Sequence, residues 1–536
     1  MIGTAIVRDK TQLSLTQALK EADVSGEVDL VLKGGRIVTG DGIFEAGVAI
    51  RDGKIVAIAA DELLPPAKKV IDVKGNHILP GIVDSEAHPG CYVPFDYDMR
   101  TESRAAACAG VTTWGIQAPS TRLGTVPFKE FVQASDVVPF SQSFGAAKEI
   151  IDTISAVDAF LTFMVETDEQ AEEIPLYIEE YGVTSYKLYM QARRIPADDH
   201  NWPSRRAGLG VGIDDGVLYR VFEQVARYGA PAICSIHPEN WEIARIFEAR
   251  ARELGRTDLG AWTDRSPHML EAQHVRAYAY VAEKLGTRMY IQHATTPSTF
   301  AEIREARSRG VEMYAQTGPA WLGFTPNDGW RINVPLRWED AQEELWKALV
   351  RGDVDVVGSD HVVAWDPADR ESMYSANIWD CRTGFSRVET FLPVMLTKGV
   401  HEGRISLERL VQVSCENPAK IYGLYPQKGA IAVGADADIV VVDTSREVKV
   451  GKEHINTRAG WSIMEGRTYH GWPIMTILRG QVTAEWADDS PGMRPVGEPT
   501  GKYLPRKPRP NVPAEPKDRL VRTGPGATLD GISPGA

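Results

Sequence analysis

Side chains of the types that bind metal ions close several short apolar runs of this chain. Glu86 and His88 end GIVDSEAH, His237 ends APAICSIH, His293 ends RMYIQH, and Asp360 ends VDVVGSD. Imidazole and carboxylate groups suit zinc, manganese, cobalt or iron. A single histidine after a strand is more often only a buried, hydrogen-bonded residue. Metal-binding residue types at the end of one run after another are harder to explain in that way, and this pattern predicts a metal site.

These runs alternate with helical patterns, which is typical of parallel strand–helix–strand units. Eight of them predict an α/β fold, a (β/α)8 TIM barrel, whose active site lies at the carboxyl ends of the strands. Lys187 on the fourth run would join the residues above, and Glu86 and His88, two apart, would point the same way. The alternative is an open doubly wound sheet, but no GxGxxG motif follows a run. The runs cover residues 81–88, 111–118, 159–165, 183–190, 230–237, 288–293, 311–317 and 354–360.

Strand-rich segments with glycine breaks stand on both sides of the barrel pattern. Asp52-Gly53, between two apolar runs, is a hairpin signal. Such segments from opposite ends of a chain can pair into one small β-sandwich domain. The proline-rich C-terminal end is either disordered or an arm laid on a neighbouring subunit. The predicted division is an N-terminal extension over 1–26, a β-sandwich domain from 27–80 and 421–488, the barrel over 81–420 and the tail over 489–536.

Composition narrows the class of protein. The 536 residues are 43% hydrophobic, and 59 basic against 73 acidic side chains give a net charge of −14. An acidic protein is poorly suited to binding nucleic acid or anionic membranes. The five cysteines are scattered, with no CxxC pair, which favours a reducing compartment. With no long apolar run and no signal-peptide pattern, the sequence predicts a cytoplasmic protein that acts on a small molecule.

The order of the motifs resembles the amidohydrolase superfamily and, within it, the hydantoinase and dihydropyrimidinase branch of cyclic amidohydrolases. The similarity spans about residues 29–488. It implies a TIM barrel with a β-sandwich domain, assembled as a homotetramer or homodimer. The matching segments are LPGIVDSEAHPG, GVTSYKLYM, SIHPEN, RSPHMLEAQHV, YIQHATT, NVPLR, VGSDH and ENPAKIYGLYPQKGAIAVGADADIVVVD.

The resemblance also implies a site for two divalent ions, zinc or alternatively manganese or cobalt. His88 and Asp360 would bind one ion, and His237 and His293 the other. Lys187 would be carboxylated by carbon dioxide, and its carbamate would bridge both ions. The ions would activate water and polarise the scissile carbonyl. Asp360 would carry the proton from the water to the leaving nitrogen as general acid and base.

Three positions depart from the branch. Glu86 stands where the first histidine of His-x-His is expected; it can bind metal through oxygen, or leave a single ion in the site. Ala192 replaces a tyrosine that holds the tetrahedral oxyanion, and Tyr189 is a possible substitute. Thr383-Gly384 replaces an Asn-Gly pair before the late substrate-binding turn. The contacts with substrate have therefore changed.

Residues near the expected strand ends bear on the substrate. Arg193 and Arg194 can bind a carboxylate, although a solvated pair is the commoner role. Aromatic residues near the strand ends usually belong to the core, but as a group they suggest an apolar or aromatic substrate. These aromatic residues are Trp114, Trp321, Phe324, Trp330, Trp365 and Trp379. The substrate-binding candidates are Tyr189, Asn333, Thr383 and Gly384.

Together these features predict a metal-dependent hydrolase of a C–N bond in a cyclic amide, imide or ureide, acting outside peptides. Hydrolysis of an acyclic or aryl-substituted amide, urea or carbamate is the alternative that the departures leave open. A third possibility, from another class, is a non-catalytic oligomeric scaffold. Retention of five ligand-type residues argues against a scaffold; they are His88, Lys187, His237, His293 and Asp360.

Overall fold

The computed structural model describes residues 26–119, 136–190, 213–364, 377–381 and 383–508. Eight parallel strands form one sheet in the order β15-β14-β13-β12-β11-β10-β9-β8, which follows the chain. A parallel bridge between Ala87 and His361 joins the first strand to the segment after the last. The strands are β8 (Ile82–Ala87), β9 (Val111–Pro119), β10 (Asp158–Met164), β11 (Ser185–Leu188), β12 (Ile233–Ile236), β13 (Met289–Ile291), β14 (Met313–Thr317) and β15 (Val356–Val357).

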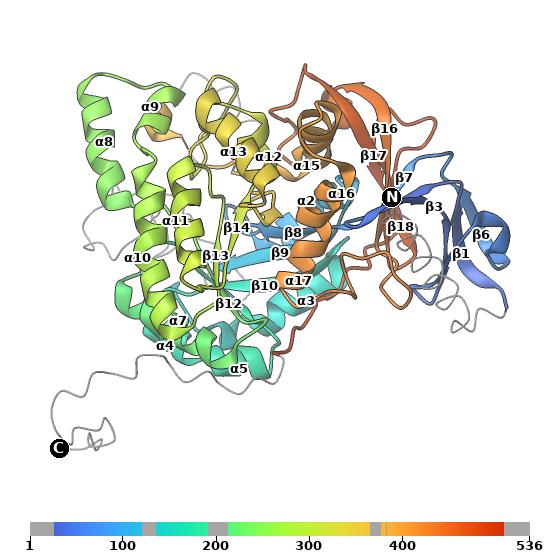
Figure 1. The fold of residues 1–536 in the computed structure, drawn as a ribbon, viewed down its shortest axis with the longest axis horizontal. Coiled ribbons are helices and arrows are strands. Elements are labelled where there is room, and N and C mark those ends of the chain that lie inside the picture. Colours follow the sequence, from blue (N-terminus) through green and yellow to red (C-terminus); the bar gives the residue numbers. More distant parts are fainter. Residues whose placement is uncertain (1–25, 120–135, 191–212, 365–376, 382, 509–536) are drawn as a thin grey trace, which may run out of the picture.

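This arrangement confirms the predicted (β/α)8 barrel, because each of the eight predicted runs overlaps one strand of the sheet. Helices pack around the outside of the sheet, as Figure 1 shows. The α-helices of the described residues are α2 (Phe95–Cys108), α3 (Phe144–Ile154), α4 (Asp168–Glu172), α5 (Ile174–Glu179), α7 (Asp215–Tyr228), α8 (Trp241–Glu253), α9 (Leu259–Asp264), α10 (Met269–Leu285), α11 (Pro297–Ser308), α12 (Pro319–Gly323), α13 (Glu339–Arg351), α15 (Phe391–Val394), α16 (Leu407–Val411) and α17 (Asn417–Ile421).

Capping residues set the ends of the long barrel helices. The Asp214 side chain accepts hydrogen bonds from backbone N–H groups in the first turn of α7, and Thr296 does the same for α11. Pro297 occupies the first turn of α11, where its missing N–H costs nothing. Gly286 follows α10 in the left-handed conformation, with φ of 76°. The polar caps therefore fix where α7 and α11 begin, and the glycine fixes where α10 ends before the next strand.

Two further sheets lie beside the barrel (Figure 1); the smaller takes its strands from the N-terminal part of the chain, and the larger takes strands from both ends. One has the order β5-β4-β1-β6, and the other has the order β19-β18-β17-β16-β7-β2-β3. The Asp52-Gly53 hairpin is present, with both residues at positive φ. The strands are β1 (Val28–Lys33), β2 (Arg36–Thr39), β3 (Gly42–Glu45), β4 (Gly47–Arg51), β5 (Lys54–Ala59), β6 (Ala67–Asp72), β7 (His77–Pro80), β16 (Ile439–Lys449), β17 (Thr468–Leu478), β18 (Gln481–Glu485) and β19 (Arg494–Pro495).

The antiparallel pairing of β7 with β16 joins the two ends of the chain, with Pro80 opposite Ile439. The described part of the proline-rich segment also contacts this chain. The backbone N–H of Ala159 donates to the carbonyl of Lys502 at 2.9 Å, and Arg506 donates through its side chain to Leu161 and Ser185 of the barrel. Residues as far as Arg506 therefore lie on the chain's own barrel. The N-terminal extension, apart from residue 26, and residues 509–536 lie outside the described residues.

A buried ammonium group ties the barrel to the sheets. Lys428 is fully buried, and its Nζ lies 2.5 Å from Asp158, 2.9 Å from Asp436 and 2.7 Å from Asp438. Asp158 begins β10, whereas Asp436 and Asp438 precede β16. Burial opposes the charge, but the carboxylates outweigh it and raise the pKa of Lys428 above its ordinary value. The lysine thus occupies the place that a cation would take among these three acids.

Within the ranges that the structure describes, no helix is both long enough and apolar enough to cross a bilayer.

We expect Lys428→Met to destabilise the fold by about 3–5 kcal/mol, because it removes the buried cation that three carboxylates share and leaves only the more exposed Arg479 beside Asp158 and Lys54 beside Asp436. The free energy of unfolding in urea is the measurement. Lys420→Met is the control, since Lys420 is exposed and pairs with Glu416 at 2.9 Å on the surface. Its loss should cost no more than about 1 kcal/mol. Equal effects of the two variants would show that the buried cluster does not hold the parts together.

Candidate metal centre

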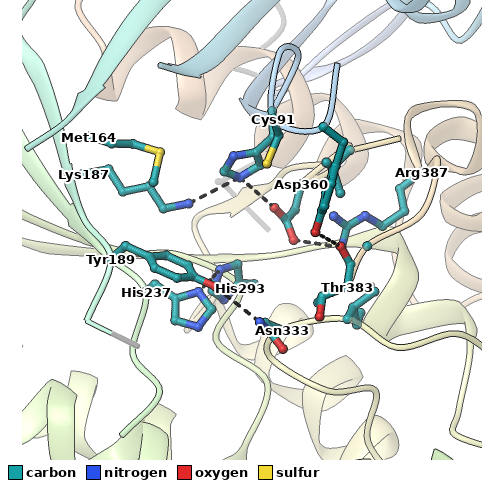
Figure 2. A pocket seen from close by; sticks show the side chains of 15 residues that line it. Cys91, Met164, Lys187, Tyr189, His237, His293, Asn333, Asp360, Thr383 and Arg387 are labelled. Carbon is teal, nitrogen blue, oxygen red and sulfur yellow. Dashed lines mark hydrogen bonds and ion pairs between the residues drawn. The ribbon is translucent and has the colours of Figure 1, made fainter. Parts of the chain in front are cut away.

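A cavity opens at the carboxyl ends of the barrel strands (Figure 2). It encloses about 470 Å³ of space between atoms, a figure that includes open solvent at its mouth. Every predicted site residue except Glu86 lines it. The lining residues are His88, Cys91, Tyr92, Met164, Lys187, Tyr189, His237, His293, Ile332, Asn333, Asp360, Val362, Thr383, Gly384 and Arg387.

Glu86 lies behind the lining lysine instead of on the wall. It is fully buried on β8, and its Oε1 is 2.9 Å from the Nζ of Lys187. Its Oε2 accepts a hydrogen bond from Gln316 Nε2 at 2.5 Å. Burial would raise the pKa of Glu86, but the positive charge of Lys187 holds it well below its ordinary value. Glu86 is therefore an ionised carboxylate that faces the site.

His88 connects this acid to the opposite end of the barrel sheet. Its Nε2 lies 3.4 Å from the Nζ of Lys187 and 3.1 Å from the Oδ1 of Asp360. Potential ligand atoms of Glu86, His88 and Asp360 all lie within 4.8 Å of one another. Asp360 holds this place with φ at 50°, a conformation unusual for a residue other than glycine. The first and last strands thus bring three metal-ligand types to one point.

Two further histidines form a second group. His237 follows β12 and His293 follows β13, and Nδ1 of the first lies 3.0 Å from Nε2 of the second. Burial lowers the pKa of His293 to about 3, so this imidazole is neutral at physiological pH. Its buried Nδ1 has no hydrogen-bond partner among the described residues. Two imidazoles that converge in this way are suited to binding a metal ion.

His237 is held from behind by an ion pair. Its Nε2 lies 3.4 Å from Oε2 of Glu239, whose Oε1 lies 3.4 Å from Arg265. Burial would raise the pKa of Glu239, but Arg265 lowers it to about 2. The guanidinium of Arg265 lies 3.4 Å from the centre of the Trp262 ring and 4.5 Å from that of Trp241. A fixed carboxylate of this kind orients the imidazole of a metal-binding histidine.

Arg387 is a site residue that the sequence analysis did not identify. Its Nη1 lies 2.8 Å from Oδ2 of Asp360, as the dashed line in Figure 2 marks. Burial would raise the pKa of Asp360, but Arg387 and His88 together outweigh burial and lower it. The available signal was position, because Arg387 comes three residues after Gly384 in CRTGFSRVE, a segment already assigned to the substrate site.

The aromatic residues that the structure describes have the core role that is usual for such positions. Trp114, Trp321, Phe324 and Trp379 are buried in hydrophobic clusters, and Trp330 packs against one. None of these five lines the cavity, so they do not support the suggestion of an apolar or aromatic substrate that the group had given; the aromatic wall comes from Tyr92 and Tyr189. Ala192, Arg193, Arg194 and Trp365 lie outside the described residues.

The donor set fits metal ions. Carboxylates, imidazoles and one lysine amine meet around the base of the cavity, and Nδ1 of His293 has no hydrogen-bond partner among the described residues. Such a set of oxygen and nitrogen ligands is typical of zinc, manganese or cobalt sites. A cationic lysine in its midst would oppose metal binding, so Lys187 decides how many ions the site can accept.

Comparison with known proteins identifies the family. The description of the amidohydrolase family matches residues 265–483. L-hydantoinase of Paenarthrobacter aurescens is 30% identical over 470 residues, which cover 85% of this chain and 94% of the relative. The chain belongs to the amidohydrolase family. Within that family it lies in the hydantoinase and dihydropyrimidinase branch, as the motif order predicted.

Other amidohydrolases of this branch give the same result. D-hydantoinase of Ralstonia pickettii is 30% identical over 496 residues, covering 90% of this chain and 99% of that protein. Allantoinase of Solibacter usitatus is 30% identical over 458 residues, which cover 84% of this chain and 93% of that protein. A solved structure of L-hydantoinase (dihydropyrimidinase) from Arthrobacter aurescens superposes with a TM-score of 0.77 at 28% identity, covering 89% of this chain and all of that one. The described fold is therefore that of the branch.

We expect Gly384→Ala to damage the cavity loop. Gly384 has φ of 109°, and an added Cβ would lie 2.3 Å from Cγ1 of Val362. The control is Gly286→Ala, because Gly286 also has positive φ but has nothing within 4 Å of a Cβ. Gly384→Ala should lose roughly 1–3 kcal/mol more stability than the control, measured by urea unfolding. A Val362→Ala background should narrow that gap; an unchanged gap would exclude the contact as its cause.

Proposed function

We propose that this protein hydrolyses a ring C–N bond of a cyclic amide, imide or ureide with the help of two divalent ions. One observation carries the proposal: carboxylates, imidazoles and a lysine converge on one cavity in a hydantoinase-branch barrel. The names of the relatives refer to hydantoin and allantoin, which are both cyclic ureides.

Zinc is the ion that we propose, with manganese or cobalt as alternatives. Glu86, His88 and Asp360 would hold one ion, since their ligand atoms lie closest together. His237 and His293 would hold the other. The lysine between these groups, Lys187, would bridge the two as a carbamate. Carboxylation replaces its positive charge with a negative one, and this removes the conflict between an ammonium group and two dications.

The ions supply two kinds of chemistry when bound, because they polarise the carbonyl and lower the pKa of water. Asp360 accepts a proton from the attacking water and passes it to the leaving ring nitrogen. The C–O bond forms, the C–N bond breaks, and the nitrogen leaves with the proton. The lowered pKa of Asp360 supports its ionised form as the starting state.

The substrate ring would meet polar groups on the opposite wall. Tyr189 accepts a hydrogen bond from Asn333 Nδ2 at 3.3 Å. Burial raises the pKa of Tyr189 well above its ordinary value, so its hydroxyl keeps its proton and can donate to the carbonyl oxygen as charge develops. Thr383 and Gly384 lie beside it on the cavity wall and would contact the ring. Tyr189 thereby takes the task of the tyrosine that the branch places at position 192.

We propose further that the protein is cytoplasmic and forms a homotetramer or homodimer. The location is supported by its cysteines, all five of which are free thiols. The assembly is supported by the resemblance to the branch. A scaffold without activity is not favoured, because the ligand-type residues are present and lie together.

The first test is ring opening. The purified protein should convert hydantoin or dihydrouracil to the acyclic acid, with addition of one water detected by mass spectrometry. Dialysis against a chelator should lower the rate by more than about tenfold, and zinc, manganese or cobalt should restore it. An acyclic aryl urea serves as the comparison substrate. Full activity without metal, or faster turnover of the acyclic urea, would contradict the proposal.

The second test concerns Glu86. We expect Glu86→Ala to lose one metal equivalent per chain, measured by elemental mass spectrometry, together with most of the activity. Glu86→His should keep two equivalents, because imidazole is also a ligand. Glu389→Ala is the matched control, since this buried acid accepts hydrogen bonds from Asn456 and Thr457 and not from a site residue. If Glu86→Ala retains full metal content and turnover, Glu86 is not a ligand.

A further inference from the structure

Arg387 is a buried cation on the cavity wall, and only part of its hydrogen-bonding capacity is used. It is 2% exposed, and its Nη1 lies 2.8 Å from Oδ2 of Asp360. Neither Nε nor Nη1 makes a well-aligned hydrogen bond among the described residues. Leaving buried donors of a guanidinium unsatisfied is costly, since each has lost its contacts with water. Arg387 also lines the cavity, so a ligand that enters the cavity comes beside a guanidinium with unused hydrogen-bonding capacity.

The surroundings fix this guanidinium in advance. Its carbon lies 5.4 Å from the centre of the Phe385 ring and 5.7 Å from that of Trp321. The backbone N–H of Arg387 donates to Nδ1 of His361 at 3.1 Å. Figure 2 shows the side chain at the end of the cavity that also holds Asp360 and Thr383. A group held in this way binds a ligand without first losing much conformational freedom.

We propose that Arg387 binds a carboxylate group carried by the substrate, so that the preferred substrate is an acidic cyclic amide or ureide. This inference rests on the proposed ring hydrolysis and names its substrate class. A guanidinium matches a carboxylate through two parallel hydrogen bonds. Apart from histidines, Lys187 and Arg387 are the cations among the described lining residues, and each lies beside a carboxylate, Glu86 at 2.9 Å and Asp360 at 2.8 Å. The proposed carboxylation removes the positive charge of Lys187, so Arg387 is the cationic side chain that remains on the wall for a substrate anion.

The cavity separates the two ends of such a substrate. Asp360 lies between His88 on one side, at 3.1 Å, and Arg387 on the other, at 2.8 Å. A ring bond presented to Asp360 therefore places a substituent of the ring next to Arg387. Tyr92 and Val362 supply apolar surface at this part of the wall, which disfavours a bulky hydrated group. A short acidic substituent meets both conditions.

A positioning role is the competing explanation, in which Arg387 only holds Asp360 in place. The two roles predict different effects on the preference for an acidic over a neutral substrate. Loss of a positioning residue slows acidic and neutral substrates alike, whereas loss of a carboxylate-binding residue lowers the preference for the acidic one. The ratio of the two kcat/KM values therefore separates them.

The kinetic test compares hydantoin-5-acetic acid with its neutral isostere, hydantoin-5-acetamide. The wild-type protein should prefer the acid, and Arg387→Met should lower that preference by about 10- to 100-fold. Arg387→Lys should keep part of it, as a point charge without the planar fork. Arg409→Met is the control, because Arg409 donates to the carbonyls of Leu349 and Val354, away from the cavity, and should leave the preference unchanged. No wild-type preference, or one that survives Arg387→Met, would overturn the proposal.

A binding test makes the inference independent of turnover. Calorimetry should show that orotate binds the wild-type protein at least about tenfold more tightly than uracil, its counterpart without the carboxylate, and that Arg387→Met removes the difference. If hydantoins are not hydrolysed but orotate binding depends on Arg387, the carboxylate site stands and the proposed function fails. If hydantoins are hydrolysed and neither test depends on Arg387, the proposed function stands and this inference fails. Failure of both substrates and both ligands contradicts both.

Discussion

Closure of the parallel sheet is the constraint on which the site depends. Asp84 on β8 accepts hydrogen bonds from the backbone N–H of Ser359 at 2.8 Å and from its hydroxyl at 2.5 Å. It also accepts one from Trp114 Nε1 on β9 at 3.0 Å. Next to it, the N–H of His88 donates to the carbonyl of His361 at 2.7 Å. These bonds join the first and last strands, so side chains almost 275 residues apart meet at one rim.

Once the rim is closed, charge becomes the next constraint, because unpaired ions are costly in a buried site. The structure pairs three buried acids of this region with basic groups: Glu86 with Lys187, Asp360 with Arg387 and Glu239 with Arg265. Behind the rim, Glu102 lies 3.0 Å from Nε2 of His361. These pairs explain why the carboxylates stay ionised despite burial. They also fix the directions in which the ligand-type side chains point.

The sequence predicted the parts of this arrangement that follow from local pattern. The eight apolar runs were recognisable because parallel barrel strands are buried on both faces, and a residue at a strand end must lie at the rim. Arg387 was not recognised, because it belongs to a loop whose position depends on contacts with Asp360 and His361, distant in sequence. The contact of Gln316 with Glu86 was missed for the same reason. Trp321 misled the interpretation, since a position near a strand end does not reveal whether a ring faces the cavity or the core.

Charge also relates the metal site to the substrate wall. Glutamate at position 86, where the motif order leads us to expect a histidine, gives the base of the site one negative charge, which lies 2.9 Å from Lys187. Arg387 places one positive charge at the wall, beyond Asp360. Negative charge therefore gathers at the base, where cations would be held, and positive charge lies at the wall, where a substituent of the substrate would lie. In a region of low dielectric the positions of such charges decide which ligands are favoured. An acidic substituent is the feature of a substrate that would benefit from a cation at this wall.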